Sequence, residues 1–177
     1  MNRTIFTIGH STRTIAEFVA LLRQVDVDFL VDVRSIPRSR AMPQFNIDTL
    51  PDSLAVHGIA YRHLRALGGR RHHPKGAPAS TNTFWRVAAF RNYADYAATD
   101  AFRAGLDELL ALADVQRCAI MCAEAVWWRC HRRIVADYLL IREVRVEHIM
   151  GLGQVTPATI TPEAIVLADG TLRYPGT

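Results

Sequence analysis

A chain of 177 residues in which 50% of the positions are hydrophobic can bury one full core, and one domain is the default at this length. Its 21 basic and 17 acidic side chains give a formal net charge of +4, which permits an anionic partner without requiring one. No run approaches the roughly 20 apolar residues of a membrane span, no secretory signal opens the chain, and three crowded cysteines argue against a disulfide framework, so we expect a cytoplasmic protein with no membrane partner.

The N-terminal part of the chain follows a strand–helix–strand pattern. Residues 4–8 are β-branched and aromatic, which is typical of a strand. Apolar side chains then recur at helical spacing over residues 15–22, and Thr14 and Glu17 form a capping-box pair at the start of that helix. Residues 29–33 predict a fully buried strand, so the unit is β-α-β with a parallel pair and a right-handed crossover.

The rest of the chain continues this alternation, which predicts an α/β fold: a single domain over residues 1–177 with a largely parallel sheet flanked by helices. Residues 164–175 contain "ADG" between two β-like runs and predict a C-terminal β-hairpin. Asp100 is the expected N-cap of the helix that follows it. The other predicted elements are helices at about 47–57, 84–98, 101–113 and 131–141 and strands at 59–64, 118–121 and 144–150.

Residues 68–81 interrupt the pattern. Their sequence, "GGRRHHPKGAPAST", is rich in glycine, proline and basic side chains and has no apolar period. A segment without regular structure that is longer than about 12 to 15 residues is commonly a functional lid or a disordered insert. We therefore expect a mobile basic loop here.

Polar side chains gather after the predicted strands. In open α/β sheets, ligands bind in the crevice beyond the carboxyl ends of the strands, so these positions predict one shared site. The candidates are His10 and Ser11 after the first strand, Asp32, Arg34, Ser35 and Arg40 at and after the second, Cys122 and Glu124 at the end of the strand near 118–121, and Cys130, His131 and Arg132 before the next helix.

The motif "CAIMCAE" places Cys122 and Glu124 on one face of a strand that ends near them. Cys122 is either a small buried hydrophobe or a functional thiol. A carboxylate is seldom buried without a partner. Glu124 is therefore expected either to pair with an arginine, Arg34 or Arg132, or to act as an acid–base group.

Cys130 lies where the next helix should begin. A thiol at that place interacts with unpaired backbone N–H groups and with the positive end of the helix dipole, and Arg129 and His131 are its neighbours; all of these favour the thiolate. Cys130 is therefore the better candidate for a nucleophile or an anion-contacting thiol. The same helix start, together with Arg132, could also bind an anion without any thiol chemistry. The structural alternative for Cys130 is a thiol that packs against the preceding strand.

No metal site is expected from this cluster. Cys122, Cys130 and His131, joined by His10 or His148, provide suitable donors, but their spacing lacks the CxxC knuckle of structural zinc sites. His148 lies on a buried strand pattern, where a hydrogen-bonded core histidine is the more common case.

The tryptophan pair Trp127 and Trp128 has two interpretations. The rings could stack on a base or sugar of a ligand. Large aromatic side chains in a strand-to-helix loop more often cover the core, which is the structural alternative.

Several motifs, read together, resemble the bacterial and archaeal domain of unknown function 488 family. They are "TIGHS", "LVDVRSIPRSR", "YRHLRALGGR", "YADY", "MCAEAVWWRCHRRIVADYL" and "EHIMG", and they extend from Thr7 to about Gly151. The resemblance implies a small cytoplasmic α/β protein with a shared site, and it names no reaction. The site that it implies, residue by residue, is Gly9, His10, Ser11, Asp32, Arg34, Ser35, Pro37, Arg40, Gly68, Gly69, Cys122, Glu124, Cys130, His131 and Arg132.

Our leading hypothesis from the sequence is an enzyme that acts on a phosphate-bearing or nucleotide-like small molecule, with its site at the carboxyl ends of the strands. One alternative is a nucleic-acid or nucleotide-binding module without catalysis, which would use the basic loop and the tryptophans. A second alternative is a metal-dependent hydrolase. The sequence identifies neither a cofactor nor an oligomeric state. The expected roles are anion binding for Arg34 and Arg132, proton transfer for Glu124 or His10, and nucleophilic or redox chemistry for Cys130 or Cys122.

Overall fold

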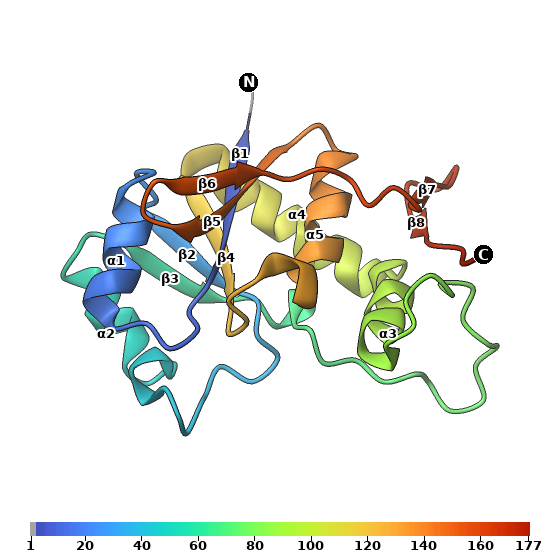
Figure 1. Ribbon diagram of the computed structural model, residues 1–177, viewed down its shortest axis with the longest axis horizontal. Helices are drawn as coiled ribbons and strands as arrows, with labels where there is room; N and C mark the ends of the chain where they lie inside the picture. The colour runs from blue at the N-terminus through green and yellow to red at the C-terminus, as the bar shows by residue number, and fades with distance from the viewer. Residues whose placement is uncertain (1–2) are drawn as a thin grey trace.

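The computed structural model describes residues 3–177, which form a six-stranded sheet with helices on both faces and a small separate hairpin (Figure 1). The strand order is β3-β2-β4-β1-β5-β6; β1 to β5 run parallel, and β6 is antiparallel to β5. This confirms the predicted α/β class, the largely parallel sheet and the C-terminal hairpin. The strands are β1 (Thr4–Gly9), β2 (Phe29–Asp32), β3 (Ala60–His63), β4 (Cys118–Cys122), β5 (Arg145–Gly151), β6 (Gln154–Pro157), β7 (Ile165–Val166) and β8 (Leu172–Arg173).

The α-helices divide between the two faces of the sheet (Figure 1). On one face, α1 and α2 bury a core that includes Phe6 and Ile8 of β1. On the other face, α3, α4 and α5 share a core with Ile5. Side chains of a strand alternate between faces, so β1 is apolar on both sides, as expected for an inner strand. The helices are α1 (Ile15–Arg23), α2 (Leu50–Ala55), α3 (Ala88–Ala97), α4 (Asp100–Val115) and α5 (Arg132–Leu140).

The helix starts follow local capping chemistry. Thr14 and Glu17 form the predicted capping box of α1: the Thr14 hydroxyl accepts from the Glu17 N–H at 3.1 Å. The predicted N-cap of α4 is wrong by one residue. Thr99 is the cap and its hydroxyl accepts from the Phe102 N–H, whereas Asp100 is the first helical residue. In that position its carboxylate still faces the positive end of the helix dipole.

Two predicted helices are shorter in the structure because long-range contacts hold their first residues. Helix 47–57 is reduced to α2, since the Ile47 N–H donates to the carbonyl of Pro37 at 3.0 Å. Helix 84–98 begins only at Ala88, because the Phe84 N–H donates to the carbonyl of Tyr174, near the C-terminus, at 3.0 Å. Strand β6 was not predicted; it returns from β5 through a turn that contains Gly153 in the left-handed region.

Residues 68–81 contain no helix or strand, as expected. Contacts hold both ends of this segment: the Arg71 guanidinium lies 3.7 Å from the centroid of the Tyr96 ring, and the Ser80 hydroxyl donates to Asp95. The mobility of the segment stays a prediction. None of the helices within residues 3–177 has the length and the apolar character that a membrane span requires.

The sheet topology creates a crevice between β1 and β4. These strands are neighbours, but the chain leaves β1 toward α1 on one face and leaves β4 toward α5 on the other face. At such a switch point the two connections diverge, and ligands bind there in open α/β sheets.

Candidate functional site

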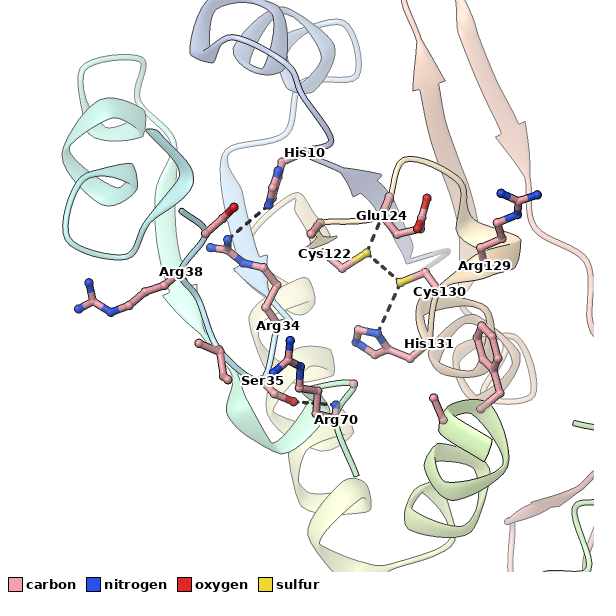
Figure 2. A pocket seen from close by; sticks show the side chains of 16 residues that line it. His10, Arg34, Ser35, Arg38, Arg70, Cys122, Glu124, Arg129, Cys130 and His131 are labelled. Carbon is pink, nitrogen blue, oxygen red and sulfur yellow. Dashed lines mark hydrogen bonds between the residues drawn. The ribbon is translucent and has the colours of Figure 1, made fainter. Parts of the chain in front are cut away.

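A cleft of about 420 Å³ opens at this switch point (Figure 2). Its volume is within the range of small-molecule sites, about 300–1,000 Å³. Most of its walls are formed by the segments that follow β1, β2 and β4 and by the N-terminal end of α5. The lining residues are His10, Arg34, Ser35, Ile36, Arg38, Ser39, Gly69, Arg70, Ala89, Phe90, Cys122, Ala123, Glu124, Arg129, Cys130 and His131.

Glycines let the loops around the cleft approach one another. A Cβ atom on Gly9 would lie 1.8 Å from the carbonyl oxygen of Glu124, and one on Gly69 would lie 2.5 Å from Nδ1 of His131. Gly68 is equally close to Ser35, whose Oγ would be 2.6 Å away. The three glycines that the family resemblance implies therefore have a steric role in assembling the site.

Asp32 and Arg34 form a buried ion pair at the end of β2. Arg34 Nε donates to Asp32 Oδ1 at 2.9 Å and Nη2 donates to Oδ2 at 2.7 Å, while Tyr61 donates its hydroxyl to the same carboxylate. Nη2 also donates to the carbonyl of Phe45, and Nη1 to Nε2 of His10 at 3.4 Å. A guanidinium carries five N–H groups. Within the described chain, one Nη1 hydrogen of Arg34 is left for a ligand in the cleft.

His10 is buried in its neutral form. Arg34 can only donate, so Nε2 of His10 accepts, and the Nδ1–H donates to the carbonyl of Ser11 at 2.9 Å. The ring stacks on Phe45 with centroids 4.4 Å apart. Burial, assisted by the Arg34 charge, lowers the pKa of His10 below its usual value although Ser11 and Asp32 act in the opposite direction. His10 is therefore a fixed acceptor near neutral pH.

Arg132 lies at the centre of a buried cluster behind the cleft and is 0% exposed. Its Nε lies 3.0 Å from Sγ of Cys122 and 3.4 Å from Sγ of Cys130. Nη1 donates to Oγ1 of Thr7 at 3.1 Å, and Nη2 donates to the carbonyl of Glu124 at 2.6 Å. The guanidinium of Arg132, a residue of α5, thus contacts both β1 and β4.

The charge of Arg132 faces sulfur instead of carboxylate. None of the ion pairs within residues 3–177 includes it, yet a buried charge needs a compensating partner. Burial acts to raise the pKa of Cys130, but the Cys122 thiol, His131 and Arg132 outweigh it and hold that pKa well below its usual range. Burial and the neighbouring Cys130 raise the pKa of Cys122. These contacts together favour a thiolate at Cys130, which accepts a hydrogen bond from the Cys122 thiol.

His131 and the start of α5 contact Cys130 from the other side. His131 precedes the first residue of α5, and its Nε2–H donates to the carbonyl of Val33 at 2.8 Å, which leaves Nδ1 at 3.5 Å from Sγ of Cys130. The backbone N–H of Arg132 also points at Cys130 Sγ, at 3.4 Å. A helix start that directs N–H groups at a sulfur favours the thiolate, as the sequence predicts.

The rim of the cleft is mainly basic and exposed. Arg70 and Arg129 are exposed and belong to none of the ion pairs within residues 3–177, whereas Arg38 pairs with Asp48. Glu124 is the only carboxylate among the lining residues of the described chain. The excess of positive charge favours an anionic ligand.

The structure brings most of the predicted site residues together. His10, Arg34, Ser35, Cys122, Glu124, Cys130 and His131 line the cleft, and Asp32 and Arg132 lie behind it as partners of Arg34 and Cys130. Ser11 is in the turn after β1 with φ 47°, where its carbonyl holds His10. Arg40 is exposed and lies outside the lining.

Two details of the sequence interpretation need correction. The expected pairing of Glu124 with Arg34 or Arg132 is wrong: its carboxylate is exposed and forms no ion pair within residues 3–177, and its carbonyl, not its carboxylate, accepts from Arg132, while the alternative acid–base role stays a prediction. Arg132 was expected to bind the anion directly, but it is fully buried and is held by β1 and β4. Periodicity could not reveal either fact, because both depend on where separate loops meet.

Thr7 is a site-associated residue that the sequence analysis missed. Because Oγ1 accepts from Arg132, its own O–H donates to Nδ1 of His148, at 2.6 Å. Trp127 stacks on the His148 ring with centroids 4.5 Å apart, so this tryptophan covers the core, while Trp128 is 46% exposed. A polar Thr7 within a buried, otherwise mostly apolar strand was the available signal.

We expect His148→Asn to reduce the loss of stability in acid. Burial and the Arg132 charge lower the pKa of His148 to about 3. The unfolded chain therefore binds one more proton than the folded chain between pH about 6.5 and about 3, and this histidine makes stability fall with decreasing pH in that window. Asparagine can accept the Thr7 hydrogen bond without titrating. Urea unfolding at pH 6, 5 and 4 should show a slope that is lower by up to about 1.4 kcal/mol per pH unit in the variant; equal slopes would contradict the assignment.

The described residues contain no group of three or more histidine, cysteine, aspartate or glutamate side chains that could hold a metal ion. The fold and the cleft define an α/β protein with an open, mostly parallel sheet and a candidate site at the β1–β4 switch point. The chain belongs to the family described as domain of unknown function DUF488, whose model matches residues 14–139. Neither a curated protein nor a solved structure matches the chain.

Proposed function

We propose that the chain is an enzyme that acts on a small phosphate-bearing or nucleotide-like molecule, with Cys130 as its nucleophile. The observation that carries this proposal is the Cys130 sulfur at the floor of a basic cleft of small-molecule size, 3.4 Å from both the backbone N–H and the Nε of Arg132. A thiolate is the reactive form of cysteine, and enzymes activate it with a helix start and a neighbouring cation, which for Cys130 are the start of α5 and Arg132.

The charged rim supports an anionic substrate. In this proposal Arg70 and Arg129 attract the anion, and the remaining Nη1 hydrogen of Arg34 orients it. Arg132 is a positioning residue, because it acts on the substrate only through the Cys130 thiolate. The anion therefore meets cations at the rim and the nucleophile further in, which separates binding from attack.

Proton transfer is assigned to Glu124. Sγ of Cys130 forms a bond to the electrophilic atom of the substrate, and the bond to the leaving group breaks with its electron pair; the leaving group takes its proton from water. A second water then attacks the adduct, the Glu124 carboxylate accepts the proton of that water, and the bond to Cys130 breaks, which releases the product and restores the Cys130 thiolate. His10 is less suited to this task, because both of its nitrogens are engaged in hydrogen bonds.

Turnover is tested on nucleoside monophosphates and sugar phosphates, with product formation followed by mass spectrometry. We expect Cys130→Ser to abolish turnover and Glu124→Gln to lower it by about 10²–10⁴-fold, since that is the usual contribution of a general base. Cys118→Ala is the matched control: its thiol lies at the opposite end of β4, outside the cleft lining, and its loss should leave turnover intact. Variants that lose activity only by unfolding would assign the cluster a structural role.

A nucleic-acid-binding module without catalysis is the second candidate, favoured by the exposed Trp128 next to Arg129. It would show affinity for a single-stranded oligonucleotide that falls steeply with salt concentration. Binding of this kind together with no turnover on any phosphate would replace the enzyme proposal.

A further inference from the structure

Cys122 and Cys130 are in contact at the floor of the cleft. Their Sγ atoms are 2.8 Å apart, and both residues line the cleft although they are only 4% and 5% exposed (Figure 2). A disulfide bond joins its sulfurs at about 2.05 Å, so closing the pair requires a movement of less than about 1 Å. Residues 123–129 lie between them in the sequence and outside the sheet, and they include a 3-10 helix over Trp127–Arg129.

We propose that Cys122 and Cys130 are a two-electron redox pair that a small hydroperoxide oxidises to a reversible disulfide. The two positions differ in their donors. Cys130 receives the Arg132 backbone N–H and lies next to His131, whereas Cys122 Sγ lies 3.7 Å from the carbonyl oxygen of Glu124, an acceptor that cannot stabilise a thiolate. Cys130 is therefore the attacking sulfur and Cys122 the resolving one, although Arg132 Nε lies slightly closer to Cys122.

The reaction balances without a metal or a cofactor. Cys130 attacks one oxygen of the hydroperoxide, the O–O bond breaks, and the leaving oxygen takes a proton to give an alcohol or water, while Cys130 becomes a sulfenic acid. Cys122 then attacks the Cys130 sulfur, the S–S bond forms, and the sulfenic hydroxyl leaves as water with the Cys122 proton. Two thiols are oxidised and one peroxide is reduced.

This inference goes beyond the proposed function and stands without it, because disulfide formation is measured on the protein alone. Hydrogen peroxide is the probe, added to the full chain in small excess. Thiols are counted by alkylation after denaturation, and the intact mass is measured. We expect the three thiols to fall to one, a loss of mass equal to two hydrogen atoms, a peptide that links Cys122 to Cys130, and full recovery with dithiothreitol.

Three variants separate this pair from general oxidation. Cys118→Ala keeps the pair and should form the same bond at the same rate. Cys122→Ala should instead accumulate oxygen on Cys130, trapped by dimedone as the sulfenic acid, and Cys130→Ala should leave Cys122 reduced at the same dose. Wild-type protein that retains three thiols, or that bonds through Cys118, would overturn the proposal, and this measurement does not depend on whether any variant folds.

Discussion

Replacing Arg132 with methionine is expected to lower the free energy of unfolding by about 3–5 kcal/mol, the cost of breaking a buried charge pair by removing one partner. Methionine fills much of the same volume but cannot donate to Thr7 or to the Glu124 carbonyl, and it leaves the Cys130 thiolate without its cation. The measurement is urea unfolding under reducing conditions at neutral pH.

Arg129→Met is the matched control for this substitution, because Arg129 is exposed at the rim and should change the free energy of unfolding by no more than about 0.5 kcal/mol. A second readout tests the electrostatic role of Arg132. The pH dependence of Cys130 alkylation should move toward the value of an ordinary thiol in Arg132→Met and stay in place in Arg129→Met. An Arg132 variant as stable as the control would show that another group neutralises the thiolate.

The second large effect is expected for Gly9→Ala, with a loss of about 3 kcal/mol or more in the free energy of unfolding, at or above the upper end of the range for overpacked sites. The added Cβ would lie 1.8 Å from the carbonyl oxygen of Glu124, a backbone atom that cannot rotate away. Relief requires the strand ends to separate, which breaks the bonds from the His10 N–H to Cys122 O at 2.9 Å and from the Ser11 N–H to Ala123 O at 3.0 Å.

Gly151→Ala provides the comparison, since its added Cβ would first meet Oε1 of Gln154, the end of a flexible side chain, at 3.1 Å. It should remain within about 1 kcal/mol of the wild type. The melting temperatures of both variants give the test. Equal melting temperatures for Gly9→Ala and Gly151→Ala would contradict the close approach of the loops that follow β1 and β4.

Local sequence patterns were sufficient to predict most helices and strands of this fold, though not β6, and most residues that line the candidate site. Hydrophobic periodicity predicts the alternating strands and helices, and the capping box at Thr14 marks the start of α1. Thiols and basic groups that follow strands predict the cleft, because parallel strands deliver their carboxyl ends to one edge. Missed boundaries, such as those of α2 and α3, occur where a distant segment binds the backbone that would otherwise be helical.

The sequence by itself therefore determined an α/β chain with a polar site at its strand ends and Cys130 at a helix start. Only the tertiary structure decided what each polar group does there. It buries Arg132 against two sulfurs, pairs Asp32 with Arg34, and leaves the Glu124 carboxylate exposed at the rim. The physical reason is that the burial and charge state of these groups depend on how the loops after separate strands meet, as where Thr7 of β1 contacts Arg132 of α5.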